Sequence, residues 1–471
     1  MQPMTEPSSD FQARVLPRLA ALLGDRISTS RVMREQHGHG EGLPDSAMPD
    51  AVAFAQTTEE VAAIAAICND TRTPLIPFGA GSSLEGHVVP LFGGVALDLS
   101  GMTRIIAVNA ESMDCRVEAG VTKEQLNSEL RASGLFFPVD PGAHATLGGM
   151  AATRASGTNA VRYGTMREVT LGLTVVTPNG RIIRTGGRAR KSAAGLDLTR
   201  LYVGSEGTLG VITEVALKLS GIPETISSAV CQFPDMQSAV GTVIAALQIG
   251  INVARIELAD EMQMRACIRY SKLDEFQEQP TLFFEFHGTP AVAAEQTETM
   301  QALAEEFGGN GFQFANRPEE RSRLWTARHN TYFANVALIP GHRLIGTDAC
   351  VPISELAACI EATRKDIEES GMTAPLVGHV GDGNFHLAIL FDPENPEDRR
   401  KAEALASRVS LRAIQFGGTC SGEHGIGIGK IRYMETEHGV ALDVMRTIKT
   451  ALDPNGIMNP GKMLPSGMGD R

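Results

Sequence analysis

Two histidines that lie close together in the sequence have the spacing of a metal-binding pair. His379 and His386 stand near the two ends of GHVGDGNFH, a segment with turn residues at its centre. If residues 381–384 form the loop of a β-hairpin, His379 faces His386 in an antiparallel pair, with Cβ atoms about 4.5–5.5 Å apart. Two imidazoles so placed can share one divalent cation. A structural role for each histidine is the alternative.

A second segment, SGEHG at 421–425, supplies a carboxylate and a further imidazole. Glu423 can complete a set of two histidines and one carboxylate, which suits Zn or Mn and leaves coordination positions for a substrate. This requires that the fold brings the two segments together. If the segment is extended, His424 points away from that ion and can serve as a general base, because an unperturbed histidine has a pKa of about 6.5. A hydrogen bond to a backbone carbonyl is the structural alternative for His424.

Three glycine-rich clusters indicate a second kind of ligand. The first, PFGAGSSLEG at 77–86, follows an expected strand, and its backbone N–H groups can form a nest for a diphosphate. Its glycine spacing is neither that of the Rossmann fingerprint nor that of a Walker A loop. The other clusters occupy residues 147–164 and 204–210. Each alone is compatible with a surface turn, but three clusters in one domain favour a large cofactor with a diphosphate and a ring system.

The elements that must position these residues alternate between strands and helices. Short strand patterns and a helix over 123–133 precede residue 220, whereas residues 138–164 show hardly any regular pattern and are expected to form an irregular, functional segment. Further strands and helices follow, up to the hairpin of His379 and His386. The pattern predicts an α/β or α+β first domain and an α+β second domain, which together make an α+β protein. Its expected parts are an N-terminal helical segment, two domains and a C-terminal segment that packs back on the first domain, with the bounds 1–45, 46–220, 221–436 and 437–471.

The composition restricts the class of protein. The 471 residues carry a net charge of -13 and 43% of them are hydrophobic, as in a soluble globular protein of two or three domains. An acidic chain gains little from a phosphate backbone, which argues against nucleic acid as the main partner. The 7 cysteines include no C-x-x-C pair and are expected to be reduced.

The N-terminal sequence bears on the location of the protein. The start of the chain, MQPMTEPSSDF, lacks the layout of a signal peptide, and no apolar run is long enough for a transmembrane segment. We therefore expect a cytoplasmic location, with peripheral attachment to the inner face of a membrane left open.

A series of motifs along the chain resembles a known family. The motifs are PFGAGSSLEG, VDPG, SGTNAVRYGTMR, VGSEGTLGVIT, LWTARHN, TDACVPIS, GHVGDGNFH, SGEHGIGIGK and LDPNGIMNPGK. Together they are similar to the FAD-dependent D-lactate dehydrogenases, a branch of the flavin D-2-hydroxyacid dehydrogenases. The resemblance implies an FAD-binding domain with two subdomains of the vanillyl-alcohol-oxidase/PCMH type at 46–220. It also implies a substrate (cap) domain with an antiparallel sheet flanked by helices at 221–436, and a C-terminal segment that returns to the FAD domain.

The resemblance also implies roles for individual residues. His379, His386 and Glu423 match the metal ligands of the family. His424 matches its catalytic histidine, and Arg328 matches the arginine that receives the substrate carboxylate; the structural alternative for Arg328 is a surface ion pair on an amphipathic helix. The expected FAD contacts lie in the glycine clusters, beside them or in the C-terminal tail, and are Pro77, Phe78, Gly79, Ala80, Gly81, Ser82, Ser83, Gly86, Pro141, Gly142, Leu147, Gly148, Gly149, Ser156, Gly157, Asn159, Tyr163, Gly164, Glu206, Gly207, Ile212 and Asn459.

The implied reaction is the oxidation of a D-2-hydroxyacid, in the first place D-lactate, to the 2-oxoacid. The metal would acidify the hydroxyl, His424 would accept its proton, and the hydride would pass to N5 of FAD. Non-covalent FAD is expected, because the surroundings of His87 do not match the motifs of covalent attachment. No haem, iron–sulfur or NAD motif is present, so an external electron acceptor is expected: a cytochrome, a quinone or an electron-transfer flavoprotein.

Other functions remain open from the sequence. D-2-hydroxyglutarate or glycolate dehydrogenases of the same family would use the same residues. A metallohydrolase could use the His379, His386 and Glu423 set without redox chemistry, although the glycine clusters count against it. A non-catalytic flavin-binding subunit is a further alternative, and the presence of all the expected metal and base residues favours an active enzyme instead. A homodimer is one option for the assembly.

Overall fold

The computed structural model describes residues 6–42 and 46–465. The chain folds into two compact units. The first contains residues up to 156, residues 164–222 and the residues from 423 onward, and the second contains residues 157–163 and 223–422. The boundaries expected from the sequence were 220 and 436. The first residues of the chain, on which the expectation of a missing signal peptide rests, and the boundary at 45 lie outside the described residues.

A small sheet begins the first unit. Its strand order is β1-β2-β4-β3, and both β2 and β3 run parallel to β4. Helix α3 (Thr58–Thr71) connects β2 to β3. Its N-cap is Thr57, whose hydroxyl accepts a hydrogen bond from the backbone N–H of Glu60. Helix α1 (Leu16–Leu23) precedes this sheet, and helix α2 (Arg31–Gln36) lies between β1 and β2. The strands are β1 (Ile27–Ser28), β2 (Ala51–Phe54), β3 (Leu75–Phe78) and β4 (Val95–Asp98).

A 5-stranded antiparallel sheet follows in the same unit, with the order β5-β6-β10-β8-β9. One face carries alternate apolar side chains, among them Val117, Leu173 and Val215, which pack on the short helices that follow. The strands are β5 (Ile105–Asn109), β6 (Asp114–Glu118), β8 (Thr170–Val176), β9 (Ile182–Gly186) and β10 (Val211–Lys218); a separate pair is β7 (Leu135–Phe136) with β11 (Ser220–Gly221). The helices are α4 (Lys123–Leu130), α5 (Leu147–Thr153), α7 (Met166–Val169) and α8 (Leu198–Tyr202).

The expectation that residues 138–164 are irregular was wrong in part. Helix α5 and a short helix α6 (Ala160–Tyr163) lie within this range. Two glycines in the first turn of α5 weaken the helical signal of the sequence. Gly148 is nevertheless required there, because a Cβ at this position would lie 2.5 Å from Cβ of Ala119. Tertiary packing thus supports a helix that local propensity does not predict.

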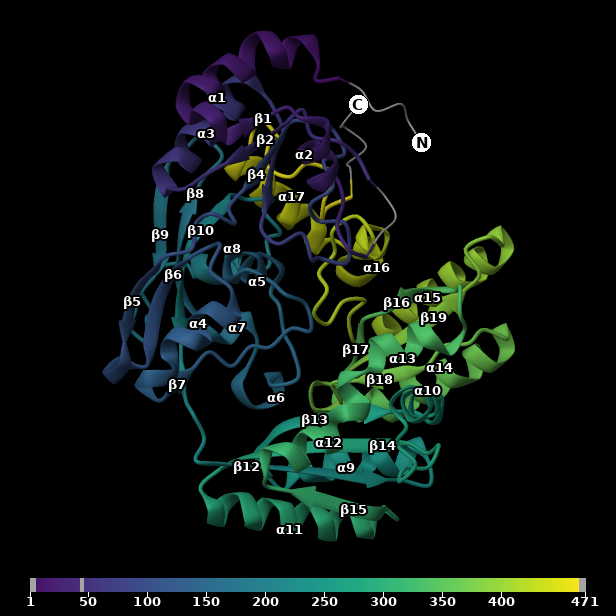
Figure 1. Ribbon diagram of the computed structural model, residues 1–471. Coiled ribbons are helices and arrows are strands. Elements are labelled where there is room, and N and C mark those ends of the chain that lie inside the picture. Colours follow the sequence, from purple (N-terminus) through teal and green to yellow (C-terminus); the bar gives the residue numbers. More distant parts are fainter. Residues whose placement is uncertain (1–5, 43–45, 466–471) are drawn as a thin grey trace. The chain divides into compact units, whose positions relative to one another are not determined.

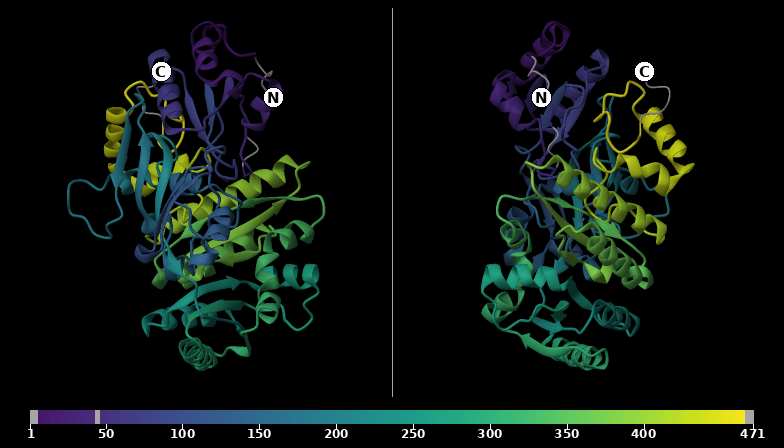
Figure 2. Two further views of the ribbon diagram at one scale, coloured as in Figure 1. Left: turned by 60° about the vertical axis from the view of Figure 1, so that its left-hand side comes forward. Right: turned by 90° about the vertical axis from the view of Figure 1, so that its right-hand side faces the viewer.

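The C-terminal segment packs within the first unit. Helices α16 (Met434–His438) and α17 (Ala441–Leu452) precede a bridge in which Met458 pairs with Leu75 of β3. Ile448 and Leu452 of α17 pack against the core of the 5-stranded sheet. Figure 2 shows these yellow helices beside the teal strands. The end of the chain therefore contributes to the same core as residues more than half the chain away.

The second unit is built on an antiparallel sheet of 8 strands with the order β15-β12-β14-β13-β18-β19-β16, in which β17 also pairs with β19. Phe284 and Phe286 of β14 face one side and Phe283 faces the other, so both faces of the sheet are covered. Figure 1 shows α11 along the outer strands β12 and β15. The strands are β12 (Thr225–Gln232), β13 (Val253–Ala259), β14 (Thr281–Gly288), β15 (Asn310–Ala315), β16 (Arg343–Gly346), β17 (Ala349–Cys350), β18 (Leu376–Gly378) and β19 (Asn384–Phe391).

The helices of the second unit divide between the two faces of its sheet. One group packs with the core that includes Phe284, and the other packs with the core that includes Phe283 and Trp325. The first group is α9 (Met236–Gln248), α11 (Pro290–Glu306), α14 (Leu356–Ser370) and α15 (Pro396–Gln415), and the second is α10 (Glu261–Ser271), α12 (Pro318–His329) and α13 (Thr331–Leu338). No helix in the described part of the chain has both the length and the apolar character needed to cross a membrane.

The expected hairpin at the histidine pair exists, but its register differs from the prediction. His386 pairs with Val377 and not with His379, which lies beyond the end of β18. The turn takes up residues 380–383, because Val380–Asp382 form a 3₁₀ turn and Gly383 adopts a φ of +77°. His379 and His386 are consequently diagonal neighbours. Their ring centroids are still 5.4 Å apart, since diagonal residues of an antiparallel pair share one face.

Candidate active site

The first glycine cluster forms a loop at the carboxyl ends of the parallel strands β3 and β4. Ligands of open α/β sheets bind at such ends. Gly81 and Gly86 adopt φ values of +72° and +73°, which favour glycine. A Cβ at Gly81 would lie 2.7 Å from the ring of Phe78. The hydroxyl of Ser83 is buried and has no hydrogen-bond partner among the described residues, so this loop fits a polar ligand.

The second glycine cluster lies next to this loop. The hydroxyl of Thr146 accepts a hydrogen bond from the backbone N–H of Gly149. A Cβ at Gly79 would lie 2.5 Å from the same hydroxyl oxygen. The loop after β3 and the start of α5 therefore approach each other closely, and glycine permits this approach on both sides.

Glu206 connects the third glycine cluster to the C-terminal segment. Its carboxylate accepts hydrogen bonds from the backbone N–H groups of Ile426 and Gly427 at 2.7 and 2.9 Å, and Nε2 of His87 is 3.3 Å away. Burial raises the pKa of Glu206, but the charge of His87 and these hydrogen bonds outweigh burial, and the pKa lies below its usual value. The carboxylate thus fixes the backbone of residues 426 and 427 by hydrogen bonds. The FAD contact expected for Glu206 stays a prediction.

Asn459 lies beside this group. Its side-chain amide donates to the carbonyl oxygens of His87 and Glu206 at 3.0 and 2.8 Å. Its own amide oxygen and Nδ1 of His87 are buried without a hydrogen-bond partner among the described residues. Such buried polar atoms need a partner, and a cofactor rich in donors and acceptors would supply it. The first unit therefore fits FAD on the ground of its own residues.

The structure divides the expected cofactor residues between the two units. Gly157, Asn159 and Tyr163 belong to the short segment that packs with the second unit. Asn159 accepts a hydrogen bond from Nε of Arg255 at 2.9 Å, and the Tyr163 hydroxyl lies 2.7 Å from Nδ1 of His287. All the other expected FAD residues belong to the first unit: Pro77, Phe78, Gly79, Ala80, Gly81, Ser82, Ser83, Gly86, Pro141, Gly142, Leu147, Gly148, Gly149, Ser156, Gly164, Glu206, Gly207, Ile212 and Asn459.

A residue that the sequence analysis missed, Glu257, organises the second unit. It lies in the middle of β13, and its side chain is fully buried between Arg328 and His379. Nε of Arg328 donates to Oε2 at 2.8 Å, and Nδ1 of His379 lies 2.7 Å from Oε1. Burial raises the pKa of Glu257, but His379 and Arg328 outweigh burial and hold it below its usual value. The signal in the sequence was an acidic residue inside the apolar strand pattern VARIELA.

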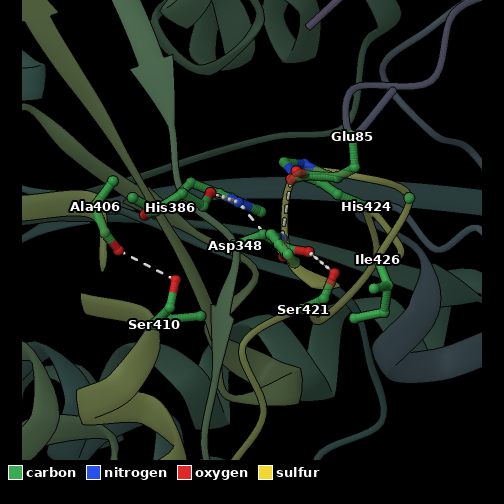
Figure 3. Close-up of polar contacts among 12 residues, drawn as sticks. Glu85, Asp348, His386, Ala406, Ser410, Ser421, His424 and Ile426 are labelled. Carbon is green, nitrogen blue, oxygen red and sulfur yellow. Dashed lines mark hydrogen bonds and ion pairs between the residues drawn. The ribbon is translucent and has the colours of Figure 1, made fainter. Parts of the chain in front are cut away.

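His386 is oriented in a similar way. Its Nδ1 lies 2.9 Å from the carbonyl oxygen of Thr347 and 3.7 Å from Oδ1 of Asp348. The buried Asp348 also accepts hydrogen bonds from Asn384 and from Ser421, the latter drawn in Figure 3. In both histidines Nδ1 therefore faces an acceptor, as in metal-ligating histidines that use Nε2 as the ligand atom. The pair fits a divalent cation on this observation.

Glu423 and His424 open the C-terminal part of the first unit. Nδ1 of His424 is 3.9 Å from Oε1 of Glu85, and Nζ of Lys430 is 3.2 Å from the same oxygen. Figure 3 shows His424 beside Glu85. A carboxylate at this position would face the imidazolium that forms when a general base accepts a proton. The joining of Glu423 to His379 and His386 stays a prediction.

Comparisons with known proteins agree with these features. A sequence model of the family "FAD binding domain" matches residues 49–186, and one of "FAD linked oxidases, C-terminal domain" matches residues 187–463. The chain is 48% identical over 456 residues to "Probable D-lactate dehydrogenase, mitochondrial" of Danio rerio, covering 96% of this chain and 92% of that protein. The chain belongs to the FAD-dependent D-lactate dehydrogenase family. Membership makes it a flavin-dependent oxidoreductase and disfavours the metallohydrolase alternative.

Further relatives of this dehydrogenase support the family and the fold. It is 46% identical to "D-lactate dehydrogenase [cytochrome], mitochondrial" of Arabidopsis thaliana, over 96% of this chain and 80% of that one. A solved structure of 4-ethylphenol oxidase from Gulosibacter chungangensis matches with a TM-score of 0.79 at 18% identity, over 98% of this chain and 99% of the other. A structure of p-cresol methylhydroxylase matches with a TM-score of 0.73 at 17% identity, over 98% of both chains. The expected vanillyl-alcohol-oxidase/PCMH-type α+β fold is confirmed.

The expected cytoplasmic location is corrected by the same relatives. The Danio rerio and Arabidopsis thaliana proteins are both named as mitochondrial. The expectation rested on the absence of a targeting pattern at the N-terminus, and such an absence is weak ground for a location. The cytoplasmic expectation is therefore withdrawn.

Proposed function

We propose that this dehydrogenase oxidises D-lactate to pyruvate with FAD as the immediate electron acceptor. The observation that carries the proposal is the 48% identity to a D-lactate dehydrogenase over 96% of the chain. The arrangement of Arg328 and His379 on Glu257 supports it, since a 2-hydroxyacid presents a carboxylate and a hydroxyl that such groups can bind.

Arg328 is proposed to receive the substrate carboxylate. Its Nε donates to Glu257, and its remaining nitrogens make no hydrogen bond to the described residues. Because the guanidinium is planar and held at one edge, it can offer the other edge to a carboxylate in a bidentate pair. This pair would fix one face of the α-carbon and so select one enantiomer.

His379, His386 and Glu423 are proposed to hold a divalent ion, Zn or Mn. When bound, such an ion supplies a Lewis acid that lowers the pKa of the substrate hydroxyl. The orientation of both imidazoles by Glu257 and by Thr347 supports the proposal. The carboxylate of Glu423 would contribute the remaining protein ligand and negative charge.

His424 is proposed to accept the proton of the hydroxyl. The Glu85 carboxylate beside Nδ1 supports this role, because it stabilises the imidazolium that results. FAD supplies, when bound, the acceptor for the hydride. The loop at 77–86, the start of α5 and Asn459 are proposed to hold it without a covalent bond.

The electron acceptor of the enzyme is proposed to be a cytochrome. The support is the name of the Arabidopsis thaliana relative, which is a D-lactate dehydrogenase of the cytochrome type. Anaerobic enzyme reduced with D-lactate should pass electrons to oxidised cytochrome c, with D-lactate-dependent absorbance of the reduced haem. Reduction of quinone analogues or of an electron-transfer flavoprotein alone would contradict the choice of acceptor without affecting the substrate.

The test of the substrate is dye-linked turnover on a panel of 2-hydroxyacids. We expect the highest kcat/KM with D-lactate, lower values with D-2-hydroxyglutarate and glycolate, and none with L-lactate. D-lactate should also bleach the visible flavin absorbance in the absence of oxygen. Equal rates with both lactate enantiomers, or a purified protein that neither contains nor takes up FAD, would overturn the proposal.

The test of the metal is removal by a chelator. Dialysis against the chelator should abolish turnover while the flavin absorbance persists, and Zn²⁺ or Mn²⁺ should restore it. Full activity of a sample shown by elemental analysis to be free of metal would remove the ion from the proposal and leave the flavin chemistry standing.

A further inference from the structure

A part of the N-terminal segment lies directly on the expected diphosphate loop. A Cβ at Gly40 would lie 2.8 Å from the carbonyl oxygen of Ser83, and a Cβ at Gly42 would overlap the backbone of Leu84. Glycine at these positions therefore permits two backbone segments to pack face to face. The match to the FAD-binding family begins at residue 49, so residues 37–42 lie outside the matched range.

His37 anchors this segment to the sheet. Its ring is buried, its Nε2 lies 2.8 Å from Oδ2 of Asp98, and its Nδ1 lies 2.9 Å from the carbonyl oxygen of Met33. Asp98 is the last residue of β4, and its other carboxylate oxygen accepts a hydrogen bond from the backbone N–H of Ser100. Both ring nitrogens and both carboxylate oxygens are thus engaged, which leaves the imidazole a single orientation.

The orientation of His37 is transmitted to the loop by aromatic packing. The His37 and Phe78 ring centroids are 4.5 Å apart. Phe78 is the last residue of β3, and its ring occupies the space beside Gly81, where a Cβ would lie 2.7 Å from it. Asp98, His37, Phe78 and Gly81 therefore form one continuous series of contacts from the end of β4 into the loop.

Ordering the loop at 77–86 costs conformational entropy. It is rich in glycine and serine, and glycine loses more conformational entropy on ordering than any other residue. A ligand that orders such a loop loses part of its affinity to this entropy, whereas a loop that is already ordered binds more tightly. Support from outside the loop is consequently a means of raising affinity for whatever the loop binds.

We propose that His37 is a positioning residue for FAD, and that it holds the loop at 77–86 in its binding conformation through Phe78. The proposal rests on the assignment of this loop to the FAD diphosphate. His37 does not touch the reacting atoms, so its loss should weaken FAD binding and leave the chemistry of the FAD that remains bound unchanged.

The test compares His37→Ala with His39→Ala. His39 is exposed and lies two residues away, so its variant controls for a change in the same segment. We expect His37→Ala to raise the dissociation constant of FAD by about 10- to 100-fold, measured by titrating apoprotein with FAD. The kcat per bound flavin should stay close to that of the wild type. The melting temperature of the apoprotein should fall, because Asp98 loses its buried partner, so FAD is titrated well below that temperature. His39→Ala should bind FAD as the wild type does.

A double-mutant cycle with Asp98→Asn separates the positioning role of His37 from a nonspecific loss of structure. Asparagine keeps the size of the side chain but removes the charge that His37 faces. If the pair acts as a unit, the double variant should lose little more FAD affinity than His37→Ala alone. Unchanged FAD affinity in His37→Ala would overturn the inference, as would a kcat per bound flavin that falls together with the affinity. Failure of the wild type to bind FAD would instead overturn the proposed function.

Discussion

Oε1 of Glu257 lies 2.7 Å from Nδ1 of His379. The carboxylate is fully buried, so this contact fixes the tautomer and the ring direction of an expected metal ligand. Nε of Arg328 binds the other oxygen of the same carboxylate. One residue of β13 therefore orients a group proposed to bind the metal and a group proposed to bind the substrate.

The first prediction concerns this carboxylate. Glu257→Gln should keep the fold and the flavin but lower D-lactate turnover by about 10- to 100-fold, which is the usual effect of losing a residue that orients a metal ligand. Metal content by elemental analysis should fall in parallel. Glu278→Gln is the matched control, because Glu278 forms an exposed ion pair with Arg265. Normal turnover and metal content in Glu257→Gln would contradict the role.

The second prediction concerns the substrate carboxylate. Arg328→Lys keeps the positive charge but loses the planar fork, so KM for D-lactate should rise at least about tenfold. Arg323→Lys on the same helix should change KM by less than twofold, because Arg323 is exposed and pairs with Glu275. Steady-state kinetics with a dye acceptor measure both values. An equal effect of the two substitutions would argue against a role of Arg328 in substrate binding.

The third prediction concerns the proton acceptor. His424→Gln should retain FAD and reduce the rate of flavin reduction by D-lactate by about 10²- to 10⁴-fold, because glutamine cannot accept the proton. Stopped-flow measurement of flavin bleaching gives this rate directly. His438→Gln lies further along the same C-terminal segment and should reduce flavin at the wild-type rate. Rapid bleaching in His424→Gln would assign the base to another group.

The fourth prediction concerns the dependence of stability on pH. Burial raises the pKa of Asp260, the N-cap of α10, from 3.8 to about 7. Between these values the folded chain keeps a proton that the unfolded chain has lost, so the stability falls as the pH rises, by up to about 1.4 kcal/mol per pH unit. Asparagine cannot ionise and is an equally good N-cap. Asp260→Asn should therefore be more stable than the wild type at pH 8, with a gain that shrinks toward pH 5.

At a second N-cap, Asp235, the same substitution is expected to lower the stability at pH 8. Hydrogen bonds from Ser238 hold the pKa of Asp235 below its usual value, at the start of α9. The folded chain therefore prefers the ionised carboxylate, and Asp235→Asn should lose stability at pH 8. Melting temperatures of both variants between pH 5 and pH 8 test the pair. A gain in Asp235→Asn would contradict the argument from hydrogen bonding, and no gain in Asp260→Asn would contradict the argument from burial.

The sequence by itself determined the features that depend on local pattern. Strands such as β3 and β13 follow from short apolar runs, and the hairpin around His379 follows from its turn residues. The glycine clusters indicated an extended cofactor, because glycine allows backbone to approach a ligand. The family resemblance rests on motifs of this kind, and the comparisons confirmed it together with the fold and the flavin chemistry.

Only the tertiary structure decided which distant residues meet. Register is a property of two strands, so the pairing of His386 with Val377 could not be read from the hairpin segment alone. The position of Gly148 against Ala119 sustains α5 in a stretch without helical pattern. Glu257 is buried on β13 between Arg328 of α12 and His379 beside the turn after β18. Both partners follow it far along the chain. Burial and long-range contact raise or lower the energy of a charged group by more than any local preference does, and they exist only once the chain has folded.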